Sequence, residues 1–284
     1  MSRMRVVGLL RLFRFELPFA AGVCVVLGEI LALGRIPPAY ELALGFLSFF
    51  FISATALILN DYFDLETDRI NAPQRPLPSG MVTKRDVLVL SIVVALLGFL
   101  ASALISLTAL LVAFVVWVAG VLYNWRFKRT GFLGNLIVSF SVGMTFIFGG
   151  IAVGNLNNTV VWWFGVIAML IDLGEEIAAD AMDIEGDRLA GSRSLAITLG
   201  EEKALRISGV VFGSVVLISG IPFVAGWLEW IYLLPISIMD AVILYSTARI
   251  FSKKSGDRRK YIRWIYLSGL LAILLFILIR MVKA

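Results

Sequence analysis

The chain has 284 residues, of which 60% are hydrophobic and only 16% are charged, and its net charge is +5. Soluble globular domains are about 45–50% apolar and about 25% charged, so this composition excludes an ordinary soluble domain. The chain contains one cysteine and no histidine, which excludes a disulfide framework, a cysteine metal site and catalysis by an imidazole base.

Nine apolar stretches follow one another along the chain, and each is close to the roughly 20 residues that a helix needs to cross a bilayer. The alternating pattern of a membrane β-barrel is absent. Because helices satisfy their own backbone hydrogen bonds in lipid, we expect an all-α polytopic protein of the cell membrane with nine transmembrane helices. The predicted spans are residues 16–34, 40–60, 87–105, 107–123, 132–153, 160–180, 205–225, 230–250 and 262–281.

The basic residues are distributed unevenly between the loops that join these spans. With nine spans, 22 of the 25 lysine and arginine residues fall on one side of the membrane, and only Arg35, Arg280 and Lys283 fall on the other. Cytoplasmic loops are enriched in Lys and Arg, so we expect a cytoplasmic N-terminus and a C-terminus outside. Membrane orientation and anionic lipid explain the excess positive charge better than nucleic acid does.

Two clusters of acidic residues with the same spacing lie at the predicted cytoplasmic ends of the second and sixth spans. The clusters are Asp61, Asp64 and Asp68, and Asp180, Asp183 and Asp187. Corresponding residues lie 119 positions apart in the common pattern D-x-x-D-(L/I)-E-x-D-R, which ends at Arg69 and Arg188. The repeat predicts a single transmembrane domain, residues 1–284, with two related halves at about 1–130 and 131–284.

The spacing of these carboxylates suggests a metal site. On a continuous helix, positions i, i+3 and i+7 share one face, so each motif would present a row of three carboxylates. Two facing rows would hold about six negative charges, which repel one another unless cations bind. Mg²⁺ prefers oxygen ligands and completes its coordination shell with waters and substrate phosphates. The pattern therefore predicts Mg²⁺ as cofactor and a phosphorylated or diphosphorylated substrate.

Polar and cationic residues near the motifs are candidates for substrate contact. Arg binds phosphate in a bidentate manner and Lys binds it as a point charge. The expected substrate-binding residues are Asn60, Arg69, Arg75, Tyr123, Lys128, Asp180, Arg188 and Arg193. For each cation alone, the orientation of the chain in the membrane is the alternative explanation. No residue stands out as a general base.

Mg²⁺ on a diphosphate in an apolar membrane cavity has a characteristic chemistry. The metal makes the diphosphate a better leaving group, and an allylic diphosphate then ionises toward a carbocation. Apolar and aromatic walls exclude water from that cation, and a second, lipid-like substrate captures it. The residues therefore predict an enzyme that transfers a prenyl group between two molecules dissolved in the bilayer, and they imply no protein partner.

The residues of both motifs resemble those of a known family. Asn60–Asp68 resembles the N-D-x-x-D-x-x-x-D motif of the UbiA superfamily of intramembrane prenyltransferases, and Asp183–Asp187 is similar to its second motif, D-x-x-x-D. Tyr123–Lys128 resembles the tyrosine-to-lysine segment between the two. The resemblance implies helices around a central cavity, capped on the cytoplasmic side and open laterally to lipid. It also implies Mg²⁺ and a polyprenyl diphosphate donor.

This resemblance also assigns roles to individual residues. The expected catalytic residues are Asp61, Asp64, Asp68, Asp183 and Asp187, and the expected metal ligands are Asn60, Asp64, Asp68, Asp183 and Asp187. Within the superfamily, Asp68–Gly80 and Asp183–Ala196 look most like archaeal digeranylgeranylglyceryl phosphate synthases. That similarity implies a geranylgeranyl diphosphate donor, geranylgeranylglyceryl phosphate as acceptor, and a role in the synthesis of ether lipids.

Alternative functions are compatible with parts of the same pattern. The acceptor could be an aromatic quinone precursor or a chlorophyll-like molecule. A cation transporter would also place carboxylates in a helical bundle, although such sites usually lie near the midplane of the membrane. A CDP-alcohol phosphotransferase uses membrane carboxylates and metal, but its D-G and A-R steps are not arranged here as its signature requires.

Four further carboxylates lie inside predicted spans and outside the motifs. They are Glu16, Glu29, Asp172 and Asp240. We expect them to make polar contacts between helices, and Glu16, near the cytoplasmic end of its span, could instead face the cavity.

Overall fold

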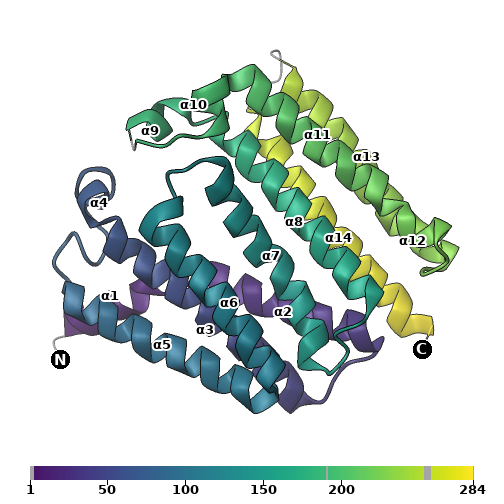
Figure 1. Ribbon diagram of the computed structural model, residues 1–284, viewed down its shortest axis with the longest axis horizontal. Coiled ribbons are helices and arrows are strands. Elements are labelled where there is room, and N and C mark those ends of the chain that lie inside the picture. The colour runs from purple at the N-terminus through teal and green to yellow at the C-terminus, as the bar shows by residue number, and fades with distance from the viewer. Residues whose placement is uncertain (1–2, 190, 253–256, 284) are drawn as a thin grey trace.

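The computed structural model describes residues 3–189, 191–252 and 257–283, and this part of the chain is helical without β-strands (Figure 1). The long helices are α2 (Glu16–Leu33), α3 (Ala39–Phe63), α5 (Lys84–Ile105), α6 (Leu107–Leu122), α7 (Phe132–Ala152), α8 (Thr159–Asp180), α11 (Glu201–Ser219), α13 (Leu233–Phe251) and α14 (Arg259–Lys283). The short helices are α1 (Arg3–Leu12), α4 (Leu65–Asn71), η1 (Tyr123–Phe127), α9 (Ile184–Leu189), α10 (Leu195–Leu199), α12 (Ile221–Val224) and η2 (Trp230–Tyr232).

The long helices correspond one to one with the nine predicted spans. Eight of those described are long and apolar enough to cross a membrane. The remaining one, α8, has 22 residues but carries four carboxylates between Asp172 and its end at Asp180. The prediction of an all-α integral membrane protein is therefore confirmed, and the count of nine spans agrees with it.

Each helix buries one side and exposes apolar side chains on the other. On α5, for example, Leu96, Leu100 and Leu104 are 57–65% exposed, whereas Val87 and Val94 are buried. Large exposed apolar faces are expected where lipid, not water, surrounds the protein.

The helices pack through small residues that let backbones approach closely. α2 and α7 are the clearest case, because a Cβ on Gly149 would lie 2.4 Å from the carbonyl oxygen of Val25. A Cβ on Gly28 would likewise lie 2.4 Å from the carbonyl oxygen of Phe146. Small residues at helix contacts are typical of membrane bundles, where dispersion forces and not hydrophobic exclusion hold helices together.

The helix α1 precedes the first span and was not expected from the hydropathy pattern. It packs against the start of α5, where Arg5 forms an ion pair with Asp86. The same carboxylate completes a capping box with Thr83, which fixes the beginning of α5. A Cβ on Gly8 would lie 2.8 Å from a side-chain carbon of Val82, so α1 packs closely against the segment that precedes α5.

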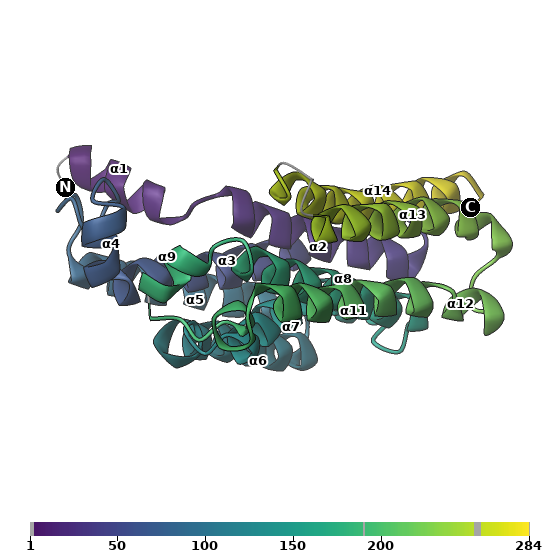
Figure 2. The same ribbon diagram turned by 90° about the horizontal axis from the view of Figure 1, so that it is seen from above.

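Most of the short helices gather at one end of the bundle. α1, α4, α9 and α10 lie at the same end, and α12 and the last residues of α14 lie at the other (Figures 1 and 2). Both acidic motifs therefore lie at one end, next to loops that the sequence predicts to be cytoplasmic.

Candidate active site

Each acidic motif lies where a membrane helix ends and a short helix begins. α3 ends just before Asp64, whose φ of −88° and ψ of 3° depart from helical geometry, and α4 starts at the next residue. α8 ends at Asp180, and α9 starts directly after Asp183. The expectation that a continuous helix presents each row on one face is therefore wrong, because the backbone turns at or near the middle aspartate.

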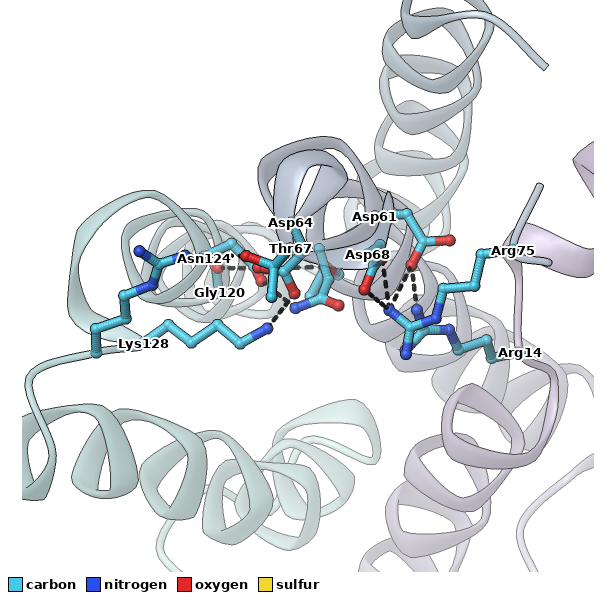
Figure 3. A network of polar contacts seen from close by, with 12 residues as sticks. Arg14, Asp61, Asp64, Thr67, Asp68, Arg75, Gly120, Asn124 and Lys128 are labelled. Carbon is cyan, nitrogen blue, oxygen red and sulfur yellow. Dashed lines mark hydrogen bonds and ion pairs between the residues drawn. The ribbon is translucent and has the colours of Figure 1, made fainter. Parts of the chain in front are cut away.

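Two aspartates of the first motif bind arginines on one side of the motif (Figure 3). Asp61 has only 1% of its side chain exposed and forms an ion pair with Arg14, while Arg75 Nη1 lies 3.9 Å from the same carboxylate. Arg75 Nη1 also donates to both oxygens of Asp68, at 2.7 and 2.6 Å. Arg14 has a φ of +43°, which is rare for a residue with a side chain.

The middle aspartate of the first motif faces the opposite way. Asp64 forms an ion pair with Lys128, which follows the π-helical turn η1 at the end of α6 (Figure 3). Nearby, Asn60 Nδ2 donates to Asn124 Oδ1 at 3.0 Å, and Asn124 donates to backbone carbonyls of α3 and α6. These contacts join the ends of α3 and α6, and a π turn of this kind is frequent at functional sites.

Three cations of the chain thus neutralise the first motif. Arg14, Arg75 and Lys128 together contact all three of its carboxylates. The repulsion expected between these carboxylates is therefore compensated, for this row, by cations of the chain itself. The assignment of Asn60, Asp64 and Asp68 as metal ligands stays a prediction.

The second motif has a different environment. Asp180 accepts a hydrogen bond from Asn135 Nδ2 at 2.9 Å, and Arg259 lies 3.9 Å from Asp183. One oxygen of Asp187, Oδ2, is buried and has no hydrogen-bond partner among the described residues. Burial raises the pKa of Asp187, and the nearby charge of Asp183 adds to this, against the effect of a hydrogen bond with Ser194. The second row is therefore less well compensated than the first.

A cavity of about 430 Å³ opens beside this second row. Its walls are formed by Glu175, Ala179, Asp180, Asp183, Asp187, Arg259, Ile262, Arg263 and Tyr266. Its volume is within the range of about 300–1,000 Å³ that is typical of small-molecule sites. Four carboxylates on one wall and two guanidinium groups on the other make it suitable for an anionic ligand bound together with a hard cation.

The residues fit Mg²⁺ as an ion that binds together with a substrate. Over residues 3–189, 191–252 and 257–283, no three acidic or thiol side chains lie close enough together to hold an ion by themselves. Mg²⁺ commonly uses one or two carboxylates, and takes its other ligands from water and substrate phosphates. The unpartnered Asp187 Oδ2 and the exposed Asp183 lie beside the cavity and are candidates for such carboxylate ligands.

Tyr123 lies between the two motifs. The acidic groups that act electrostatically on its hydroxyl include Asp64 of the first motif and Asp180 of the second, together with Glu176 and Asp172. The predicted tyrosine-to-lysine segment therefore lies close to acidic groups of both motifs. Of its two ends, Lys128 contacts the first motif directly.

None of the five expected substrate-binding cations lines the cavity, and Arg75 and Lys128 contact the first motif instead. Arg69 is exposed and pairs with the exposed Glu66 at 2.9 Å. Arg188 and Arg193 are exposed as well, and neither lines the cavity. Their position at this end of the bundle agrees with membrane orientation, and their role in substrate binding stays a prediction.

The sequence reasoning missed several residues of the site. Arg14 contacts Asp61 and Glu175 lines the cavity, although neither is among the expected site residues. Arg259 and Arg263, which also line the cavity, belong only to the basic residues used to orient the chain. Their helical spacing of four residues, next to a long apolar run, is the signal that could have placed them on one face.

The carboxylates inside the spans have mixed environments. Asp172 accepts a hydrogen bond from Ser139, and Asp240 accepts one from Ser219, so these two make the expected contacts between helices. Glu29 is fully buried, and neither of its oxygens has a hydrogen-bond partner in the described part of the chain, so the expectation is wrong there. Glu16 is exposed.

The sequence matches a known protein family. A model of the UbiA prenyltransferase family matches residues 21–269. The chain belongs to the UbiA prenyltransferase family. The resemblance inferred from the motifs is thus confirmed, and so is the class of intramembrane prenyltransferases.

Curated relatives within this family match over nearly their whole length. The chain is 34% identical to digeranylgeranylglyceryl phosphate synthase of Thermococcus kodakarensis over 267 residues, which cover 93% of this chain and 94% of the relative. It is 35% identical to the synthase of Methanopyrus kandleri over 256 residues, covering 89% and 93%. It is 32% identical to the synthase of Natronomonas pharaonis over 277 residues, covering 98% of each chain.

Solved structures of the family have the same fold. A structure from a study of digeranylgeranylglyceryl phosphate synthase in membranes has a TM-score of 0.86 at 28% identity, covering 98% of this chain and 99% of the other. The apo structure of a UbiA homologue from Aeropyrum pernix has a TM-score of 0.79 at 20% identity, covering 93% and 98%. A UbiA homologue from Archaeoglobus fulgidus bound to GPP and Mg²⁺ has a TM-score of 0.69 at 19% identity, covering 96% and 99%.

Proposed function

We propose that this UbiA-family chain transfers a geranylgeranyl group from geranylgeranyl diphosphate to geranylgeranylglyceryl phosphate, in the synthesis of archaeal-type ether lipids. The observation that carries the proposal is the similarity to synthases named for this product, which extends over 93% of the chain at 34% identity. The geometry supports it, because two acidic motifs and several arginines lie together at one end of a bundle whose outer surface is apolar.

Mg²⁺ is the proposed cofactor, and a UbiA homologue of the same fold is bound to GPP and Mg²⁺. The residues that would hold the ion are Asn60, Asp64, Asp68, Asp183 and Asp187. The bound ion neutralises the diphosphate and improves it as a leaving group. Asp61 and Asp180 lie next to these ligands, and each is held by a partner, Arg14 and Asn135 respectively.

The chain's own cations would orient the donor. Arg75 and Lys128 contact the first motif through its carboxylates, so both guanidinium and ammonium groups are close to where a diphosphate would approach the acids. Arg75 follows α4 in a loop that contains three prolines, which limits its movement. Tyr123, which lies close to acidic groups of both motifs, would add a hydroxyl and an aromatic ring to the site.

The reaction joins the hydroxyl oxygen of the acceptor to the allylic carbon of the donor. The bond between that carbon and the diphosphate oxygen breaks, and the diphosphate leaves with the bonding electrons. The hydroxyl proton passes to a carboxylate or to the released diphosphate. Exclusion of bulk water from the site favours the acceptor over hydrolysis of the carbocation.

The orientation and the internal repeat belong to the same proposal. An N-terminus and an active site on the cytoplasmic side, with the C-terminus outside, are supported by the distribution of Lys and Arg over the loops. A single domain with related halves at about 1–130 and 131–284 is supported by the equivalent positions of the two motifs, each at the end of a long helix.

Product analysis with the purified protein in detergent tests the proposal. The assay contains Mg²⁺ and labelled geranylgeranyl diphosphate, with geranylgeranylglyceryl phosphate or an aromatic acceptor in parallel. We expect a labelled diether phosphate that is absent when EDTA is added. Transfer to the aromatic acceptor alone would move the chain to the quinone-side-chain branch, and no transfer by folded protein to either acceptor would refute the proposed reaction.

A further inference from the structure

The cavity beside the second motif has two chemically different walls. The ends of α8 and α9 form an acidic wall that contains Asp180, Asp183 and Asp187. The start of α14 forms the opposite wall with Arg259, Arg263 and Tyr266. Because α14 is helical from Arg259 onward, positions 259, 263 and 266 follow the i, i+4, i+7 spacing and share one face.

The positive charges of the two arginines of this wall are compensated only weakly by acidic groups of the chain. Arg259 has 65% of its side chain exposed, and Asp183 lies 3.9 Å away, at the limit of an ion pair. For Arg263, no hydrogen bond or ion pair is found with any residue in the described part of the chain. The neighbouring Arg258, by contrast, donates to Glu201 at 2.8 Å. Membrane orientation explains cations at this end of α14, but not why two of them line a cavity opposite the motif.

The position of Arg263 on α14 suggests the source of its ligand. Leu267, Leu271, Leu274 and Leu278 continue from it along the helix at i+4, i+8, i+11 and i+15, and each is 47–58% exposed. This stripe faces lipid, as on any spanning helix. An amphiphile that lies along it with its chain in the bilayer brings its headgroup to Arg263 and to the mouth of the cavity.

We propose that Arg259 and Arg263 bind the phosphate group of the prenylated acceptor and so orient its hydroxyl toward the second acidic motif. This proposal rests on the proposed function, which supplies an acceptor with a phosphomonoester. A phosphomonoester that binds without metal needs guanidinium partners, whereas the diphosphate of the donor is matched to carboxylates through Mg²⁺. In geranylgeranylglyceryl phosphate, the phosphate and the reacting hydroxyl are on adjacent carbons. A phosphate held on α14 therefore keeps that hydroxyl within the same cavity as the acids.

The test compares Arg259→Gln and Arg263→Gln with a matched control, Lys260→Gln. Lys260 carries the same charge on the same helix, but it is exposed, lies 4.9 Å from the ring of Tyr261, and does not line the cavity. Each contact between arginine and phosphate is a charge-assisted hydrogen bond, so each arginine variant should raise KM for the phosphorylated acceptor about tenfold. KM for geranylgeranyl diphosphate and the Lys260→Gln kinetics should stay within about twofold of wild type.

Binding without turnover gives an independent readout. Geranylgeranylglyceryl phosphate should raise the melting temperature of the wild-type protein in detergent more than geranylgeranylglycerol, which lacks the phosphate. The double variant Arg259→Gln/Arg263→Gln should lose this difference while its melting temperature without ligand stays unchanged. If it misfolds, Arg263→Lys replaces it, since that change keeps the charge and removes bidentate binding.

The outcomes separate this proposal from the proposed function. A wild-type protein that makes no diether phosphate refutes the function itself. A wild-type protein that makes it, with arginine variants whose acceptor KM is unchanged, refutes the phosphate site alone. An equal increase in KM for the donor would also refute it, because it would assign both arginines to the diphosphate.

Discussion

The ion pair between Arg14 and Asp61 should make a large contribution to the stability of this protein. Asp61 is 1% exposed, and its other cation, Arg75, is 3.9 Å away and already bound to Asp68. Replacing Arg14 with alanine would leave a buried carboxylate with poor compensation. Breaking a buried pair in this way costs about 3–5 kcal/mol. Because Arg14 is 31% exposed, water can partly replace it, so we expect a loss of about 2–3 kcal/mol.

A double-mutant cycle isolates this interaction. The variants are Arg14→Ala, Asp61→Asn and the double variant, and their free energies of unfolding are measured in mixed detergent micelles from the fluorescence of the seven tryptophans. The left-handed backbone at position 14 is unfavourable for arginine and alanine alike, so its contribution cancels. Asp61→Asn removes the buried charge, so the two changes should be coupled by about 2 kcal/mol.

Arg69→Ala is the matched control for this cycle. Arg69 belongs to the same motif, but both it and its partner Glu66 are more than half exposed. Such a pair contributes about 0–1 kcal/mol, so its loss should barely change stability. The reasoning would be refuted if Arg14→Ala destabilised the protein no more than Arg69→Ala, or if the effects of Arg14→Ala and Asp61→Asn simply added.

Three further predictions concern the metal site and the packing. Asp183→Asn should lower the rate of prenyl transfer about 100-fold or more without changing the unfolding midpoint, because the side chain is 64% exposed beside the cavity; an active variant would remove it from the site. Chelation with EDTA should stop transfer, and Mg²⁺ should restore it better than Ca²⁺, which prefers more ligands; activity that persists in EDTA would argue against a metal. Gly149→Ala should destabilise the fold by about 1–3 kcal/mol, since its Cβ would lie 2.4 Å from Val25 O, whereas Gly213→Ala, with nothing within 4 Å, should be neutral in the same unfolding titration.

The sequence was sufficient to predict the spans but not all their ends. The fourth predicted span, 107–123, agrees closely with α6, which ends at Leu122. The second, 40–60, is shorter than α3, which continues to Phe63. Hydropathy reports where the chain prefers lipid, and a helix can continue into polar sequence beyond that boundary. The helix α1 was missed for the same reason, since it is only 10 residues long and carries three arginines.

The sequence was also sufficient to predict the acidic residues of the motifs, but not the residues that contact them. Arg14 is 47 residues away from Asp61, and Lys128 is 64 residues away from Asp64. No local spacing rule connects residues so far apart, because their contact depends on how α2, α3 and η1 pack. The wrong expectation of an unbroken helix through each motif has a similar origin, since helical spacing does not reveal a turn such as that at Asp64.

The two motifs share a spacing but differ in their electrostatic environment, and this difference comes from residues outside them. Arg14, Arg75 and Lys128 compensate the first motif, whereas the second has an amide partner, a distant arginine and one unpartnered oxygen of Asp187 among the residues described. A carboxylate that is already paired with a cation attracts a metal less strongly, because part of its charge is compensated. The second motif has fewer such pairs among the residues described, and it already faces a cavity. A repeat in sequence therefore predicts that the two motifs occupy equivalent positions in the fold. How far the negative charge of each carboxylate is compensated depends instead on the residues that surround it in space.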